Sequence, residues 1–200
     1  SARQADLSAR MEALKALQEK VKTDGKLKPW LAKHGLDGLQ GLWSRIHIEQ
    51  GWENTLEGAL RERMGALEVS RLDMVRSFAG DAPPAKLAFY SPPQAAVPEA
   101  AGALPRLSDL LRLNDAGQKA LLADWLHGCY TAASFEDALA ARSQLKPGEV
   151  IYVKTGHAVT AHSVSFYAQD SEQAGLLARA QEIENLDKQL KAQALIAEEP

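Results

Sequence analysis

The two ends of the chain carry the same narrow apolar stripe, with two positions per heptad. In the first segment the stripe consists of Leu7, Met11, Leu14, Gln18 and Val21, with the glutamine at one inner position. In the last segment it consists of Leu176, Ile183, Leu186, Leu190 and Ala197. A stripe this narrow is typical of a coiled coil rather than of a helix packed on a globular core.

One of these arms leads into the middle of the chain and the other leads out of it, so a pair formed by them must be antiparallel. Isolated helices of about 25 residues are marginal in water, and pairing buries both stripes. We therefore predict an antiparallel coiled coil from residues 1–33 (arm and junction) and 169–200, with the first helix ending near Asp24 and Gly25. The alternative is that both helices lie on the central domain.

Between the arms, short strand-like and helical patterns alternate. Strand-like patterns cover residues 42–48, 66–69, 86–90, 108–113, 129–132, 149–155 and 158–167, the last two joined by a turn at Gly156 and His157. Helical patterns cover residues 52–64, 71–78, 118–127 and 135–142. In helix 71–78, Leu72, Val75 and Phe78 are predicted to be buried.

This middle part consists of two similar halves. Residues 46–60 align with residues 111–125, so that Ile46 meets Leu111 and Leu56 meets Leu121. Residues 80–105 hold six of the nine prolines, a density that fits neither a helix interior nor a central strand. We predict a bilobed α+β (mixed α/β) domain, with its first half at residues 34–93, a link at 94–105 and its second half at 106–168.

Composition narrows the possible functions. The 200 residues include 23 Lys and Arg and 26 Asp and Glu, and the net charge of −3 argues against a nucleic-acid binder that uses its whole surface. The single cysteine excludes an internal disulfide framework and any four-cysteine zinc site, and it also excludes an arm-tip zinc hook, which needs C-x-x-C.

No apolar stretch is long enough to span a bilayer, and the start lacks a signal peptide's apolar core, so we expect a cytoplasmic protein. Because the chain starts inside a helical pattern without Met, we also expect a piece of a longer protein.

Candidate catalytic chemistry is sparse. The chain contains no phosphate loop, no dinucleotide-binding glycine pattern and no nucleophile elbow. Cys129 lies in a predicted buried strand, where a core role is expected. The odd spacing of His157 and His162 places them on opposite faces of a strand, which argues against a shared metal. We predict no catalytic residue, no metal site and no enzyme activity in this chain.

Several stretches resemble, in order and spacing, the hinge of structural-maintenance-of-chromosomes (SMC) proteins. They are residues 38–48 (GLQGLWSRIHI), 51–60 (GWENTLEGAL), 86–92 (KLAFYSP), 107–111 (LSDLL) and 148–160 (GEVIYVKTGHAVT). Residues 170–186 resemble the start of the outgoing arm in proteobacterial SMC proteins. Where hinges usually carry several glycines after the closing hairpin, this chain has larger residues, including Phe166 and Tyr167.

The resemblance implies a homodimerisation module in which each half of one subunit meets the other half of its partner. The predicted last strand forms a long edge, and a partner's edge would satisfy its backbone groups. The predicted interface residues are Gly38, Gly41, Gly156, Val159, Ala161, Ser163, Val164 and Phe166. Ordinary core packing is the alternative for Val159, Val164 and Phe166.

A lysine-rich stretch marks the junction between the first arm and the domain. It contains Lys15, Lys20, Lys22, Lys26, Lys28 and Lys33. Only Glu19 and Asp24 oppose these charges. The stretch suggests weak, sequence-independent and salt-sensitive DNA contact, although the favoured alternative is a solvated face of the coiled coil.

By the same resemblance, the full-length protein carries an ATPase head that uses ATP and Mg²⁺, and works with a kleisin and accessory subunits. Such a protein condenses and segregates chromosomes and associates with the nucleoid, whereas the hinge itself holds no cofactor. The competing hypothesis is a dimerising scaffold domain outside the SMC family that binds no DNA.

Overall fold

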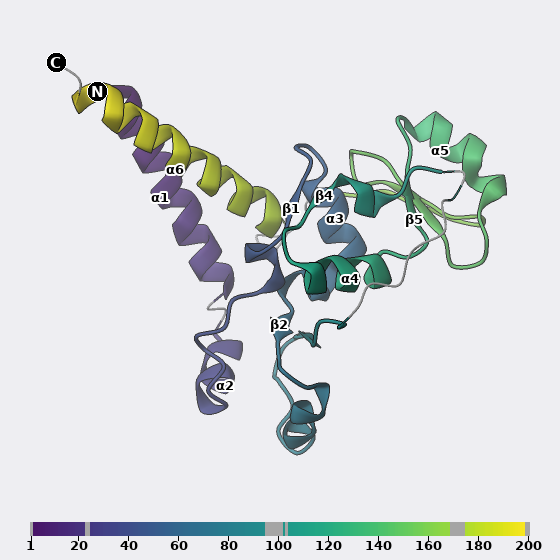
Figure 1. Ribbon diagram of the computed structural model, residues 1–200, viewed down its shortest axis with the longest axis horizontal. Coiled ribbons are helices and arrows are strands. Elements are labelled where there is room, and N and C mark those ends of the chain that lie inside the picture. The colour runs from purple at the N-terminus through teal and green to yellow at the C-terminus, as the bar shows by residue number, and fades with distance from the viewer. Residues whose placement is uncertain (1, 23–24, 95–101, 103, 169–174, 199–200) are drawn as a thin grey trace.

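The computed structural model describes residues 2–22, 25–94, 102, 104–168 and 175–198, apart from the side chains of residues 19–22, 197 and 198 (Figure 1). The predicted stripe positions Val21 and Ala197 are among those side chains. The predicted helix end at Asp24 also lies outside the described residues.

Two long helices, α1 (Ala2–Lys22) and α6 (Leu176–Glu198), lie side by side and project from the rest of the molecule (Figure 1). The start of α1 lies beside the end of α6, so the pair is antiparallel. Met11 and Leu186 are buried in the arms, and an ion pair joins Arg10 of α1 to Glu182 of α6. The predicted antiparallel coiled coil is confirmed.

A short helix that the sequence patterns did not predict, α2 (Leu27–Lys33), follows α1. Its proline, Pro29, lies in the first turn, where a missing N–H costs no helical hydrogen bond. Trp30 of this helix is buried. The chain therefore turns into a separate element before it reaches the first half.

The two halves contain nearly the same succession of elements, in which η denotes a 3-10 helix. The first half comprises η1 (Leu42–Ser44), β1 (His47–Ile48), α3 (Glu53–Leu60), η2 (Arg61–Gly65), β2 (Leu67–Glu68), η3 (Leu72–Phe78) and β3 (Phe89–Tyr90). The second half comprises η4 (Leu107–Leu110), β4 (Leu111–Arg112), α4 (Ala116–Trp125), β5 (Cys129–Thr131), α5 (Phe135–Ala141), η5 (Arg142–Gln144), β6 (Val150–Tyr152), β7 (Ala158–Val159) and β8 (Val164–Ser165). The predicted repeat and the mixed α+β class are confirmed.

One two-stranded sheet spans the two halves, and each half also has a sheet of its own. Strand β1 pairs with β4 across the halves in antiparallel register, with Ile48 opposite Leu111. Each half then forms its own parallel pair, β2 with β3 and β5 with β6, around a connecting helix or 3-10 helix. Only the second half extends its sheet, to the order β5-β6-β7-β8 within the described residues.

Several predicted elements are shorter than expected. The predicted strands at residues 42–48 and 108–113 each begin with a 3-10 turn, and in the first of them the Ser44 hydroxyl bonds the carbonyl of Gly41. The predicted helix at residues 52–64 is α-helical only to Leu60, because Arg61 has a φ of 56°. The predicted helix at residues 71–78 is the 3-10 helix η3, whose Leu72 is 53% exposed rather than buried.

The prediction of one long last strand at residues 158–167 is wrong. The chain instead forms two short antiparallel strands, β7 and β8, with Val159 opposite Val164. The turn between them is closed by the amide of Thr160, which donates to the carbonyl of Ser163 at 2.9 Å. Because of this turn, the exposed edge of the sheet is only as long as β8.

The main core is shared by both halves and by the outgoing arm. Its largest fully buried side chains come from the first half (Leu42, Ile46, Leu56, Leu60, Met64), the second half (Leu107, Leu122) and α6 (Leu177). A smaller core of Ala138, Ile151, Val153 and Val159 lies within the second half. The halves are therefore fused through a common interior.

Thr55 of α3 supplies a buried polar link between the halves. Its hydroxyl lies 3.1 Å from the carbonyl oxygen of Val153 and 3.2 Å from that of Lys154, both just beyond β6. The residue is fully buried. Because its hydroxyl bonds carbonyls across the halves, Thr55 fixes α3 relative to the second-half sheet.

Replacing Thr55 with the isosteric valine (Thr55→Val) leaves these carbonyls without the hydroxyl donor. We expect a loss of about 1–3 kcal/mol in the free energy of unfolding, measured by urea titration. Thr155→Val makes the same change at an exposed position and should stay within about 0.5 kcal/mol of wild type. Equal effects of the two substitutions would contradict the role of Thr55.

Candidate functional site

Strand β8 is the outermost strand of the second-half sheet within the described residues. Val164 in the strand is 38% exposed, and Phe166 just after it is 72% exposed. The Phe166 ring rests on the rings of Phe135 and His157, with centroids 5.7 and 5.1 Å away. The edge thus presents backbone groups for strand pairing next to a supported but uncovered aromatic ring.

The hairpin that leads to this edge depends on Gly156. Its φ is +95°, and a Cβ atom there would lie 2.7 Å from Cγ of Tyr167, so a larger residue would be both strained and crowded. The amide of Tyr167 donates to Nδ1 of His157 at 2.9 Å, which closes the far end of the hairpin.

The structure separates the other predicted interface residues into exposed and buried groups. Ser163 is exposed and Ala161 partly exposed in the turn before β8, and Gly38 is exposed before η1. Val159 is fully buried in the smaller core, where it contributes to packing within the chain. Gly41 is also buried, and a Cβ atom there would lie 2.6 Å from Nε1 of Trp43.

Exposed apolar residues of the first half include Leu39, within the predicted interface segment 38–42, and Leu72 and Met74, which the sequence reasoning missed. Leu39, Leu72 and Met74 are 37%, 53% and 53% exposed. Leu72 was assigned to a buried helical face because its spacing with Phe78 fits a helix. In the structure η3 contains no buried residue, so Leu72 is exposed and Val75 and Phe78, which were also predicted to be buried, are only partly buried.

The predicted DNA-contacting lysines are not equivalent. Lys15, Lys26 and Lys28 are exposed, whereas Lys33 forms an ion pair with Asp81, with 2.8 Å between Nζ and Oδ2. The side chains of Lys20 and Lys22 lie outside the described residues. Among the described residues, Lys28 of α2 and Lys26 just before it are therefore exposed and form no ion pair.

The outgoing arm is joined to the domain by a partly buried carboxylate. Glu57 of α3 accepts hydrogen bonds from the amides of Gly175 and Leu176, at 2.9 and 3.2 Å, where α6 begins. A helix start carries amides without helical partners and a positive end of the dipole, so a carboxylate stabilises it. Burial raises the pKa of the Glu57 carboxyl above its ordinary value, and the two amides and Arg179 oppose that rise.

A second set of contacts continues along α6. The Gln181 side chain accepts from the amide of Ile48 at 3.0 Å and donates to Glu53 at 2.9 Å. His47 lies 2.8 Å from Glu184, across a polar groove of about 440 Å³ between β1 and α6. These contacts bind the first three turns of α6 to the first half.

The incoming arm is attached to α6 through a buried glutamine. Gln18, at an inner heptad position, donates to the carbonyl of Leu176 at 3.0 Å and accepts from Arg179 at 2.8 Å. A polar residue in a heptad core fixes the register of the paired helices. Gln18 was the only residue of this junction that the sequence singled out: a polar side chain at an inner heptad position needs a hydrogen-bond partner once it is buried.

Among the described residues there is no group of His, Cys, Asp and Glu side chains that could hold a metal ion. Cys129 lies in β5, partly buried against the main core. No helix in the described part of the chain is both long and apolar enough to cross a membrane. The features that remain are an uncovered sheet edge, exposed apolar side chains on both halves and a polar arm junction.

No protein-family model matches the chain. A chromosome partition protein Smc from Delftia acidovorans is 73% identical to it over 203 residues, which cover 100% of this chain and 17% of that protein. A protein of the same name from Burkholderia pseudomallei is 58% identical over 194 residues, or 96% of this chain and 17% of that protein. The chain belongs to the SMC family.

Solved structures place this SMC chain within the family architecture. The hinge domain of the Geobacillus stearothermophilus SMC protein, described as an asymmetric dimer, matches with a TM-score of 0.70 at 17% identity, over 96% of this chain and 83% of that chain. A Pyrococcus furiosus Smc hinge domain with an extended coiled coil matches with a TM-score of 0.51 at 12% identity, over 97% of this chain and 83% of that chain. At these identities the likeness establishes the fold, which is that of an SMC hinge with its flanking arms.

The SMC chain spans 17% of the length of the curated relatives named above. The residues that connect hinge and arm, Glu57 and Gln181, were not predicted from the sequence. Each lies on a polar helix face, and only the folded arrangement brings that face against the start of another element.

Glu57→Gln tests the partly buried carboxylate at this junction. The folded SMC hinge binds the Glu57 proton more tightly than the unfolded chain does, because burial raises the pKa. The stability that this group contributes is therefore present below the unfolded pKa of 4.5 and lost as pH rises through the folded value. We expect the unfolding free energy of wild type minus that of the variant to fall as pH rises above 4.5, measured by urea titration.

Glu62→Gln, at an exposed position in η2, is the matched control. The same pH dependence in both variants would contradict the role of Glu57.

Proposed function

We propose that this chain is a homodimerisation hinge, in which the β8 edge of one copy meets the first half of a second copy. The observation that carries the proposal is the free edge of β8 with the exposed side chains of Val164 and Phe166. Strand pairing at this edge satisfies backbone groups that otherwise invite uncontrolled association.

Exposed apolar side chains on both halves support a two-fold arrangement. Leu39, Leu72 and Met74 lie on the first half and Val164 and Phe166 on the second. In one chain the second-half sheet and η3 project in different directions (Figure 1). A two-fold dimer covers two such surfaces at once, because each copy supplies both. The Geobacillus stearothermophilus hinge, which this chain resembles in fold, is itself described as a dimer.

In the longer protein, such a dimer joins two copies at the ends of their arms. The names of the relatives suggest a role in chromosome partition. An ATPase head that uses ATP and Mg²⁺, a kleisin partner and nucleoid association remain predictions from the family resemblance. A scaffold outside the SMC family is no longer an alternative, since the chain belongs to that family.

The double variant Val164→Asp, Phe166→Asp tests the edge. Two carboxylates at an apolar contact repel a partner copy, so we expect the particle mass from light scattering to fall from twice the chain mass of 21.7 kDa to a single one. Both side chains are exposed, so the fold is retained, whereas Val159→Asp would disrupt the smaller core.

The control is Ala140→Asp, which adds a carboxylate at an exposed position of α5 in the same half. An unchanged mass for the double variant would contradict the assignment of β8, as would an equal loss of dimer in the control.

We propose DNA contact at the arm junction as a second function. It is favoured by the exposure of Lys26 and Lys28 in and next to α2, where neither forms an ion pair within the described residues. Phosphate contacts by a few lysines give weak, sequence-independent binding that falls steeply with salt.

Lys26→Glu with Lys28→Glu should weaken binding to duplex DNA about tenfold or more at low salt and flatten its salt dependence, measured by fluorescence anisotropy. Lys119→Glu with Lys146→Glu changes the same charge at exposed positions of the second half. Equal DNA affinity in the two double variants would contradict a site on α2.

A further inference from the structure

The two arms enter the domain through different attachments. The outgoing helix α6 is bound directly to the first half by Glu57 and Gln181, and its Leu177 is fully buried in the main core. The incoming helix α1 packs on α6 and reaches the domain through α2. Four residues separate α1 from α2, so the Cα atoms of Lys22 and Leu27 can lie at most about 18 Å apart, and a large displacement of α1 must pull on α2.

Helix α2 is held on η3 by one buried aromatic anchor. Trp30 is 6% exposed, its ring centroid lies 5.0 Å from that of Phe78 and 4.5 Å from that of His34, and its indole N–H donates to the carbonyl of Asp81 at 2.8 Å. Burying a tryptophan side chain is among the larger stabilising contributions that a single residue makes.

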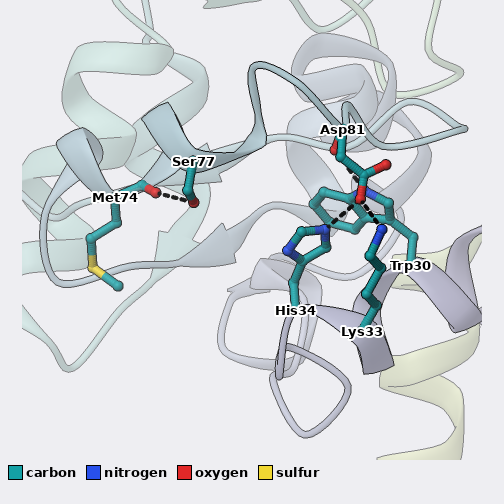
Figure 2. Close-up of polar contacts among 6 residues, drawn as sticks. All are labelled: Trp30, Lys33, His34, Met74, Ser77 and Asp81. Carbon is teal, nitrogen blue, oxygen red and sulfur yellow. Dashed lines mark hydrogen bonds and ion pairs between the residues drawn. The ribbon is translucent and has the colours of Figure 1, made fainter.

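The Asp81 carboxylate adds a polar clasp (Figure 2). Its Oδ2 lies 2.8 Å from Nζ of Lys33 and 3.0 Å from Nε2 of His34, and these two groups lower the pKa of Asp81. The Asp81 side chain is 42% exposed, so these ion pairs are weak and screened by salt. The clasp therefore orients α2, while Trp30 holds it.

The segment under the clasp has little other support. Its 3-10 helix η3 contains no buried residue and exposes Leu72 and Met74. Its internal bonds are local, such as that from the Ser77 hydroxyl to the carbonyl of Met74 at 3.1 Å (Figure 2). Segments with few buried contacts open at low free-energy cost. Loss of α2 would therefore release η3 as well.

We propose that α2 is a strap that couples the incoming arm to η3, and that it detaches with η3 when α1 leaves α6, while α6 stays fixed to the core. The position of the arms is thereby transmitted to the exposed surface of η3 in the first half. The contacts that carry this inference lie within one chain, although Leu72 and Met74 of η3 also belong to the surface that we assign to a second copy.

Hydrogen exchange with mass spectrometry on the full 200-residue chain tests the strap. The substitution Met11→Asp places a charge between α1 and α6 and so separates the two arms. Met11 is 8% exposed between the arms and far in sequence from α2. We expect amides that report on the strap, those of His34, Leu36 and Asp81, to exchange about tenfold faster or more. The amides of α3 and the bond from Arg179 to Gly175 at the start of α6 should keep wild-type rates.

Ala9→Asp makes the same substitution on the exposed face of α1 and should leave all these rates unchanged. Unchanged rates at the strap amides in Met11→Asp, when α1 itself exchanges freely, would overturn the proposal. Equal acceleration at the start of α6 would also overturn it, because the outgoing arm would then not be the fixed one.

A second pair of variants tests the clasp without disturbing the arms. Asp81→Asn keeps the carbonyl that accepts from Trp30 but removes the charge, so exchange at His34 and Leu36 should quicken and lose its dependence on salt. Asp73→Asn removes another ion-paired carboxylate from η3, whose Oδ2 lies 3.4 Å from Nη2 of Arg71. This substitution should leave hydrogen exchange at α2 as in wild type. Identical exchange at α2 in wild type and Asp81→Asn would refute the clasp.

Discussion

The apolar interior shared by the two halves and α6 is the constraint on which the rest of this hinge depends. Leu56 and Leu60 from α3, Leu122 from α4 and Leu177 from α6 belong to one core, so neither half is complete without the other. The cross-half pairing of β1 with β4 is short, and its register is supported by the packing beneath it. Because the first turn of α6 contributes to that interior, the direction of the outgoing arm is set by core packing.

Polar contacts at the junction act within this apolar frame. Glu57 is placed by α3, which the core holds, and its carboxylate meets the unpaired amides where α6 begins. Gln18 and Arg179 then fix α1 relative to α6, since each is buried and each has a hydrogen-bond partner. The burial that makes these groups costly to leave unpaired also makes the arrangement specific.

The surfaces offered to other molecules lie where this frame ends. The second half extends its sheet by β7 and β8, which have no counterpart in the first half, and the extension creates the edge that we assign to a second copy. The first half ends instead in η3, a segment with exposed apolar side chains braced by α2. The pseudo-repeat therefore yields two unlike surfaces, and a two-fold dimer can pair them because each copy supplies both.

The sequence alone determined the arms, the repeat and the family, because each is written in local periodicity or in the order of short motifs. The apolar stripes that contain Met11 and Leu186 predict that the two helices pair, whatever their exact ends. The alignment of Ile46 with Leu111 reflects equivalent strands in the two halves. Alternation along a strand separates Val159 from Val164, but only the tertiary structure decided that Val159 faces the core and Val164 the surface. The same holds for Trp30 and Asp81, which are 51 residues apart, and for Glu57 and Gly175, which are 118 apart. Contacts between such distant residues depend on how elements pack, which no local pattern encodes.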